Sequence, residues 1–285
     1  MIDLHLHTTA SDGRLSPAEL VARVSAAGIT TMGVTDHDTV AAVGEVSALA
    51  APLGIRVVAG IEVTAVDHGR DVHMLAYFVD VDSPALLGFL ARQRELRVAR
   101  VREIGMRLAA LGAPVDVDGV LVPAALRPGA SVGRPQLARA LVAAGHVRSV
   151  QEAFDRLLAT GQPAFVPRSG PSPFDVVRVV HDEGGLVSIA HPGVTKRDDL
   201  IAPLAEAGMD ALEAYHSDHA PDVERQYLDM AARLGLAVTG GSDFHGEDPS
   251  SPSPRPQRAV LGQVTLPADQ LAAFEALRAS RRGRP

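Results

Sequence analysis

Seven short apolar segments recur along this chain of 285 residues, and each contains or ends in a histidine or a carboxylate. Most of them are separated by segments with helical periodicity. Residues 16–27 and 172–182 both begin with Ser-Pro and carry an acidic residue three positions after the serine, which is the signature of a helix-capping box. Strands alternating with helices are typical of an α/β fold, in which crossover helices join parallel strands. The seven predicted strands are residues 2–7, 31–37, 56–62, 72–77, 186–191, 211–216 and 236–245.

The alternation breaks between the fourth and fifth predicted strands. Clusters of helix-breaking residues lie at both edges of this stretch, at 83–84 and 161–163. We therefore predict a mainly helical insertion, or cap domain, over residues 82–164, set into a main domain of residues 1–81 and 165–285. Within the insertion, the pattern predicts helices at 86–111, 135–144 and 150–159, and a loop at 114–128.

Composition narrows the range of functions. The chain is 46% apolar and 21% charged, so it can bury a large core, and its net charge of −7 argues against a general nucleic-acid coat protein. Because there is no cysteine, a metal site must consist of histidines and carboxylates. We find neither a signal peptide nor an apolar stretch long enough for a membrane span, and therefore expect a cytoplasmic protein without membrane contact.

The distribution of the histidines is the most informative feature. His5 and His7 alternate at the end of the first strand and so point to the same face, and Asp243 and His245 repeat this spacing at the last. In a barrel of parallel strands, all carboxyl ends open onto one face, where active sites form. Any one of these residues has an ordinary structural explanation as a packed histidine or a helix cap. The nine candidate metal ligands are His5, His7, Asp12, His37, Glu62, His73, His191, Asp243 and His245.

Gathered on one face, these nine side chains indicate metal binding, because clustered carboxylates and imidazoles are costly to bury without cations. Nine ligands exceed the needs of one tetrahedral ion and suit two or three ions that share a bridging carboxylate. Such a centre carries positive charge and suits a phosphate group. Since the sequence lacks a nucleophile triad, a phosphate-binding glycine loop and a dinucleotide fingerprint, hydrolysis by a metal-activated hydroxide is the chemistry that we predict.

The order of these motifs closely resembles the polymerase-and-histidinol-phosphatase (PHP) superfamily, from residue 1 to about residue 247. The resemblance implies a distorted (β/α)7 barrel with a trinuclear metal centre, in which Mn is favoured and Fe or Zn is possible. The helical insertion further resembles the branch that contains 3′,5′-nucleotide bisphosphate phosphatases and short-RNA 5′→3′ exonucleases. The motifs are His5-Leu6-His7, Ser11-Asp12-Gly13, Thr35-Asp36-His37-Asp38, Gly60-Ile61-Glu62, Ala190-His191-Pro192 and Gly241-Ser242-Asp243-Phe244-His245.

The resemblance also implies how the ligands are shared among three ions, with Glu62 bridging two of them. One ion would be held by His5, His7, Glu62 and Asp243. A second would be held by Glu62, His73 and His191, and the third by Asp12, His37 and His245.

Four other residues are candidate substrate-binding residues: Arg134, Arg168, His216 and Ser131. Arg134 lies at the predicted start of a helix, where free backbone N–H groups favour an anion, so we expect it to hold a second phosphate. Its competing explanation is an ordinary surface arginine. Residues 92–107 carry six arginines against two glutamates, which indicates either a solvated helix face or a basic wall facing an anionic substrate. The related branch often has His where Gln136 stands, which leaves the fine substrate preference open.

We therefore predict a metal-dependent phosphoesterase that removes a phosphate from a small nucleotide, such as a 3′,5′-bisphosphate, through attack by a metal-bridging hydroxide. The enzymatic alternatives are a 5′→3′ exonuclease on short RNA, a cyclic-phosphate phosphodiesterase and a histidinol-phosphate-type phosphatase. A catalytically silent PHP module that serves as a scaffold is the alternative outside enzymology. We predict no obligate protein partner.

Overall fold

A computed structural model provides the coordinates of the chain and describes residues 1–126, 129–246 and 260–282. All seven predicted strands form, and they lie in one sheet in sequence order. The sheet closes between its first and last strands, because the amide of Asp243 donates to the carbonyl of His5 and the amide of His7 donates to the carbonyl of Phe244. The strands are β1 (Ile2–Leu6), β2 (Thr31–Val34), β3 (Arg56–Asp67), β4 (Arg70–Tyr77), β5 (Leu186–Ile189), β6 (Ala211–His216) and β7 (Ala237–Gly241).

The predicted (β/α)7 barrel is therefore confirmed, with one departure from the parallel pattern. β4 runs antiparallel to both β3 and β5. Only His68 and Gly69 connect β3 to β4, and both have positive φ, as in a two-residue hairpin turn. The expectation of parallel strands was wrong here, because a parallel neighbour requires a crossover of a dozen or more residues.

Helices cover the outside of the barrel, and their predicted starts are confirmed. Ser16 accepts from the amide of Glu19, whose side chain accepts from Ser16 in return, and Ser172 forms the same reciprocal pair with Asp175. Apolar strand residues such as Leu4, Leu75 and Leu212 form the main core with helical partners. The helices are α1 (Pro17–Ala26), α2 (Val43–Ala50), η1 (Ala51–Leu53), α7 (Pro173–Asp182), α8 (Pro192–Thr195), η3 (Asp198–Leu200), α9 (Ile201–Glu206), α10 (Pro221–Leu234) and α11 (Ala268–Arg282).

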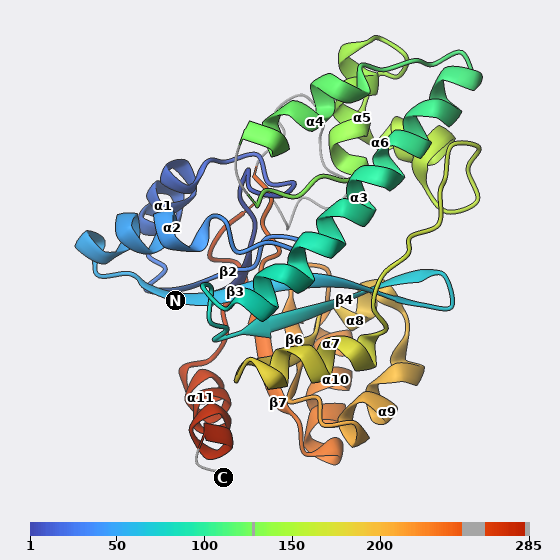
Figure 1. Cartoon of the computed structure of the whole chain (residues 1–285). Coiled ribbons are helices and arrows are strands. Elements are labelled where there is room, and N and C mark those ends of the chain that lie inside the picture. The colour runs from blue at the N-terminus through green and yellow to red at the C-terminus, as the bar shows by residue number, and fades with distance from the viewer. Residues whose placement is uncertain (127–128, 247–259, 283–285) are drawn as a thin grey trace.

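The stretch between β4 and α7 is helical. α3 (Pro84–Ala110) leaves the barrel and runs diagonally to a group formed by α4 (Val117–Leu126), α5 (Arg134–Ala143), α6 (Val150–Ala153) and the short turn η2 (Phe154–Leu158), as Figure 1 shows. This group has an apolar core of its own, which includes Ile104, Leu141 and Leu158.

The loop predicted at 114–128 was wrong over 117–126, where α4 lies. Gly119 and Pro123 suggest a break in the helix, but the Asp116 side chain accepts from the amide of Gly119 and supports the first turn. Tertiary packing also favours the helix, since Val117 lies against Gly105 of α3.

Hydrogen bonds tie the helical group to the loop that follows β1. The amide of Ser131 donates to the carbonyl of Ala10 over 2.8 Å, and the Gln136 side chain donates to the carbonyl of Ser11 over 2.6 Å.

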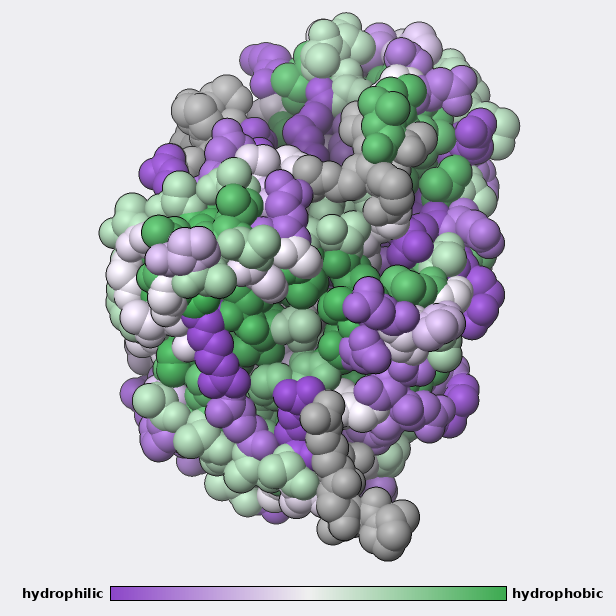
Figure 2. All heavy atoms as spheres, turned by 60° about the vertical axis from the view of Figure 1, so that its left-hand side comes forward, coloured by the Kyte–Doolittle hydropathy of each residue, from purple (hydrophilic) through white to green (hydrophobic). Residues whose placement is uncertain are grey.

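Figure 2 shows one face of the molecule, with hydrophobic residues gathered toward its middle and hydrophilic residues frequent along its right-hand side. Among the described helices, none combines the length and the apolar character needed to cross a membrane.

Candidate metal centre

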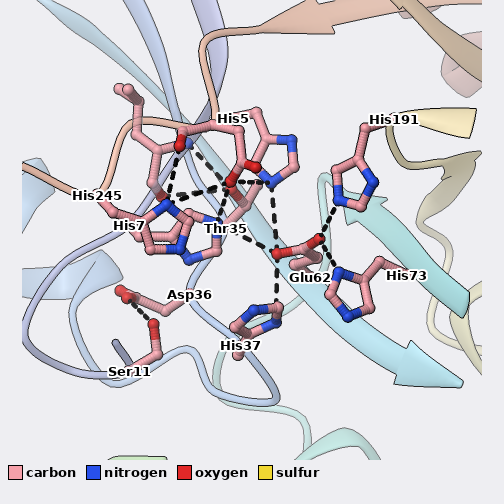
Figure 3. Close-up of polar contacts among 12 residues, drawn as sticks. His5, His7, Ser11, Thr35, Asp36, His37, Glu62, His73, His191 and His245 are labelled. Atoms are coloured by element: carbon pink, nitrogen blue, oxygen red, sulfur yellow. Dashed lines mark hydrogen bonds and ion pairs between the residues drawn. The ribbon is translucent and has the colours of Figure 1, made fainter. Parts of the chain in front are cut away.

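The nine predicted ligands come together at one end of the barrel, and we call them the metal-ligand cluster. Their nitrogen and oxygen atoms form overlapping groups in which all ligand atoms lie within 4.8 Å of one another. One group joins β1, β3 and the loop after β7, and a second lies around Asp12 on the loop after β1. Figure 3 shows His37, His73 and His191 around the carboxylate of Glu62. These groups are His5, His7, Glu62 and Asp243; His7, Asp12, His37 and His245; and His37, Glu62 and His73. His191 joins them through Glu62, with 3.0 Å between its Nε2 and the Glu62 Oε1.

The backbone near these ligands is constrained. His191 and Asp243 adopt positive φ angles of 28° and 54°, which side chains other than glycine rarely adopt and which mark functional loops. Gly241 allows β7 to approach β1 closely, because a Cβ at this position would lie 2.4 Å from the backbone nitrogen of His5. Unusual backbone conformations and the close approach of β7 to β1 therefore help to position these ligands.

Distances within the first group match those between ligands of a bound cation. His7 Nε2 lies 3.2 Å from both Glu62 Oε2 and Asp243 Oδ1, and His5 Nε2 lies 3.4 Å from the same two oxygens. Ligands bonded at about 2.1 Å to one ion are separated by about 3.0 to 3.4 Å in octahedral or tetrahedral geometry.

Several of these nitrogen atoms have no other partner. The buried Nε2 atoms of His5 and His7, and the Nδ1 atoms of His37 and His73, make no hydrogen bond with any described residue. Since buried polar atoms are nearly always satisfied, these nitrogens fit a metal ion as the missing partner.

Glu62 lies at the junction of two ligand groups. Its Oε1 lies 2.7 Å from His73 Nδ1 and 3.0 Å from His191 Nε2, whereas its Oε2 lies 3.2 Å from both His7 Nε2 and His37 Nδ1. This arrangement fits a carboxylate that bridges two ions. His37 also faces Asp12, with 3.8 Å between Nε2 and Oδ2, so its ring lies between two groups rather than within one.

Burial and charge set the protonation of the cluster. Burial lowers the pKa of His37 to about 3 and that of His191 to about 4, so both rings are neutral at pH 7 and keep a free lone pair. Although burial opposes it, the surrounding histidines, His37 first, hold the pKa of Glu62 well below its usual range. His37, His191 and Glu62 thus present the forms that bind metals. Although burial opposes it, contacts with Asp243 and Glu62 raise the pKa of His7 to about 10, so a bound cation would displace a proton from this ring.

The sequence analysis did not identify two residues that support the metal-ligand cluster, Glu213 and Asp36. Glu213, in β6, accepts from His5 Nδ1 over 2.9 Å and from the amide of His191 over 2.8 Å. Fixing the proton on Nδ1 leaves Nε2 of His5 available for a metal. Asp36 accepts from Thr8 and Ser11 and so holds the loop that carries Asp12. A lone glutamate within an apolar strand was the available signal for Glu213, because a buried charge requires a partner.

The candidate substrate-binding arginines lie in a second polar group, which we call the arginine cluster: Arg97, Arg100, Arg134 and Arg168 with Asp38 and Asp71. Arg134 Nη2 and Arg168 Nε each lie 3.3 Å from an Asp71 oxygen, and Arg97 contacts Asp38. Four guanidinium groups against two carboxylates leave an excess of two positive charges. Burial lowers the pKa of Arg168 to about 9.

The arginine-rich helix is therefore not simply a solvated face. Arg97 and Arg100 of α3 are 6% and 8% exposed and point into the arginine cluster. Arg134 begins α5, as predicted, and its guanidinium lies 5.8 Å from the Phe154 ring centre and 5.7 Å from that of Phe165. It is thus a partly buried, stacked arginine rather than an ordinary surface residue.

His216 and Ser131 occupy different surroundings. His216 accepts from the amide of Asp218 through Nδ1, so its ring proton is on Nε2, which lies 3.6 Å from Asp243 Oδ2. His216 therefore faces the metal-ligand cluster and lies apart from the arginine cluster. The Oγ of Ser131, in a residue only 4% exposed, has no hydrogen-bond partner among the described residues.

Comparison with known proteins decides the family. The model of the PHP domain matches residues 3–111. The 5′-3′ exoribonuclease Rnm of Escherichia coli is 34% identical over 85% of this chain and 84% of its own length. The 3′,5′-nucleoside bisphosphate phosphatase of Chromobacterium violaceum is 34% identical over 86% of this chain and 87% of its own. The chain belongs to the PHP family. It is accordingly a phosphoester hydrolase, as the sequence predicted.

Solved structures support the same fold. A putative metal-dependent phosphoesterase from Bifidobacterium adolescentis superposes with a TM-score of 0.85 at 31% identity, covering 96% of this chain and 95% of its own. An amidohydrolase from Chromobacterium violaceum, solved with bound sulfate and no metal, has a TM-score of 0.81 at 31% identity, covering 96% of both chains. A further relative by sequence is a phosphoribosyl 1,2-cyclic phosphate 1,2-diphosphodiesterase of Eggerthella lenta, which is 33% identical over 86% of this chain and 94% of its own length.

Proposed function

We propose that this PHP protein removes one phosphate from a small nucleotide that carries a second phosphate, such as a nucleoside 3′,5′-bisphosphate. The proposal rests on one observation: the metal-ligand cluster and the arginine cluster, both of which can attract anions, lie side by side. On β4, Asp71 of the arginine cluster lies two residues before His73 of the metal-ligand cluster, and Asp38 directly follows His37. A substrate with two phosphates matches two adjacent sites of positive charge.

In this proposal, the nine residues of the metal-ligand cluster hold two or three divalent ions, with Glu62 as the bridge, and Mn is the favoured metal, with Fe or Zn as alternatives. Bound ions would stabilise charge on the phosphoryl oxygens and lower the pKa of a water molecule. Glu213 keeps the His5 ring in the orientation that exposes Nε2, and Asp36 fixes the loop that presents Asp12. His216 Nε2, which lies 3.6 Å from Asp243 Oδ2 and has no hydrogen-bond partner among the described residues, can donate to a substrate oxygen beside Asp243.

The arginine cluster acts on the second phosphate. Arg134 and Arg168 offer their remaining N–H groups to an anion. Ser131 lines a narrow pocket with Asp12 and Arg97, where its unpartnered hydroxyl can contact another part of the substrate. Because Asp71 already occupies part of the guanidinium surface, the cluster can stay folded without substrate. We assign residues 82–164 as a cap domain that carries Arg97, Arg100 and Arg134 to the main domain of residues 1–81 and 165–285. A cytoplasmic location and the lack of an obligate protein partner remain part of this proposal.

A 5′→3′ exonuclease acting on short RNA is the second candidate, because the relatives include exoribonucleases of 34–35% identity. The same two sites would then hold the terminal phosphate and the phosphodiester to be cleaved. We propose a direct comparison of phosphate release from adenosine 3′,5′-bisphosphate with nucleotide release from a short 5′-phosphorylated RNA, with a cyclic phosphate as a third substrate. Faster turnover of the RNA would favour the second candidate.

Elemental analysis of protein purified without chelator tests the metal content separately. We expect two to three transition-metal ions per chain, and fewer than one ion per chain would contradict the proposed ligand assignment. If the fully metal-loaded protein hydrolysed no phosphoester, the result would instead favour a catalytically silent PHP module that serves as a scaffold.

A further inference from the structure

The loop that follows β1 and carries Asp12 is held by the helical insertion. Three consecutive carbonyls of this loop accept hydrogen bonds from the segment 131–139. The pairs, donor first, are Ser131 and Ala10 (2.8 Å), Gln136 and Ser11 (2.6 Å), and Arg139 and Asp12 (3.4 Å). A loop with three successive carbonyls bound in this way cannot shift without breaking its contacts with the insertion.

The loop that follows β2 has a similar link to the insertion. Asp38 comes directly after His37, and its side chain contacts Arg97 of α3. The carbonyl of Asp38 accepts from Arg94, also of α3, over 3.1 Å. The insertion therefore holds the backbone at or beside two candidate metal ligands, Asp12 and His37.

These two ligands belong to one group, which we call the Asp12 group: His7, Asp12, His37 and His245. His245 Nε2 lies 3.2 Å from Asp12 Oδ1, and His37 Nε2 lies 3.8 Å from Asp12 Oδ2. A carboxylate with imidazoles on both of its oxygens suits a metal ion. In the proposed centre, this group would hold the third ion.

The ligands around Asp243 are supported from within the barrel instead. Glu213 of β6 accepts from His5 Nδ1 over 2.9 Å. Asp3 of β1, which is fully buried, accepts from the amides of His5 and Ser242 over 3.2 and 3.0 Å. Because Ser242 precedes Asp243, Asp3 ties the strand of one ligand to the turn that carries another. These supports all belong to the main domain.

We propose that the helical insertion controls the occupancy of the third metal position, with Gln136 and Arg139 as positioning residues for Asp12. The inference rests on the metal centre of the proposed function. Hydrogen bonds that orient a ligand change metal affinity by roughly 10- to 100-fold. The two ions next to Glu62 are held by groups that the barrel supports and bind independently of these contacts, whereas the third ion depends on them.

Gln136→Met tests the proposal, because methionine has a similar length and no charge but cannot donate to the carbonyl of Ser11. We expect the Kd of the third Mn²⁺ to rise about tenfold or more, while two Mn²⁺ ions bind as in the wild type. Elemental analysis after equilibrium dialysis against buffered Mn²⁺ gives the binding curves. Arg139→Gln is the second variant and should act in the same direction, although loss of a positive charge alone would tighten cation binding.

Ser149→Ala is the matched control. Ser149 caps α6 in the same insertion and, like Gln136, accepts from a backbone amide, so this variant loses a helix cap without touching the β1 loop. All Mn²⁺ ions should bind to it as in the wild type. Asp12→Asn identifies the third ion: adding Gln136→Met to this variant should cause no further loss, since both changes act on one site.

Equal weakening of all ions in Gln136→Met and Arg139→Gln would overturn the proposal, as would unchanged binding of all ions in both variants. A wild-type protein that binds only two Mn²⁺ ions would also overturn it, without contradicting hydrolysis by a two-ion centre. The expected selective loss in a protein that hydrolyses no phosphoester would support this inference and contradict the proposed function alone.

Discussion

The metal-ligand cluster and the arginine cluster lie next to each other, but their polar and charged atoms are satisfied in different ways. In the first, the buried atoms His5 Nε2, His7 Nε2 and His73 Nδ1 have no hydrogen-bond partner among the described residues. In the second, Arg97, Arg134 and Arg168 already contact Asp38 or Asp71. The first group therefore requires cations to satisfy its atoms, whereas the second is partly neutralised within the protein. Changes in the first should abolish the reaction, and changes in the second should alter substrate choice.

The largest effect is expected from Glu62→Gln. The amide lacks the charge and one of the acceptor oxygens that bridge the two ligand groups, so we expect activity to fall by more than about 100-fold, the upper end of losses found for merely supporting residues. Metal content measured by elemental analysis should fall with it. Glu206→Gln, at an exposed position on α9, is the control. Retention of full metal content and activity would show that Glu62 is not a bridge.

Glu213→Gln should have a smaller effect in the same cluster. The glutamine can still accept from His5 but no longer supplies negative charge behind the ring, so metal affinity should fall by roughly 10- to 100-fold. A competition titration with a chelating dye measures this affinity directly. Excess metal should restore activity, a rescue that a general folding defect would not show.

Sequence reasoning identified the residues that the fold gathers into the metal-ligand cluster, but it did not identify the residues that support them. His5, His7 and Asp243 stand out because their spacing follows strand periodicity, and that periodicity is local. Glu213 was not identified, since its partner His5 is 208 residues away and only the closed barrel brings them together. The direction of β4 was wrong for a related reason, because a two-residue connection decides it rather than the apolar pattern.

The arginine cluster was only partly predictable. Arg134 was marked by its place before Pro135 at a helix start, which is a local signal. Arg97 and Arg100 were not separable from the exposed arginines of α3, because which face of a long helix is covered depends on what packs against it. Asp71 was not recognised at all, although it holds both Arg134 and Arg168.

Arg134→Ala tests the difference between the two clusters, since it should alter substrate choice and leave the metals in place. Loss of a charged hydrogen bond of about 1.5 to 3 kcal/mol corresponds to a rise of roughly 10- to 100-fold in KM for a nucleoside 3′,5′-bisphosphate. Hydrolysis of a nucleoside monophosphate should change little. Arg148→Ala is the control, because its side chain is 95% exposed. An equal loss on both substrates would mean that Arg134 only maintains the fold.

Asp71→Asn should give the smallest effect and in the opposite direction. Removing this carboxylate leaves Arg134 and Arg168 with one fewer competing charge, so binding of a second phosphate should tighten. For a partly exposed charge the gain is about 0.5 to 1 kcal/mol, or roughly twofold to fivefold in KM for the bisphosphate. This gain should shrink as salt concentration rises, because screening weakens the interaction. A weaker affinity would instead show that Asp71 is needed to place the guanidinium groups, so that the arginine cluster, like the metal-ligand cluster, depends on its partner for geometry.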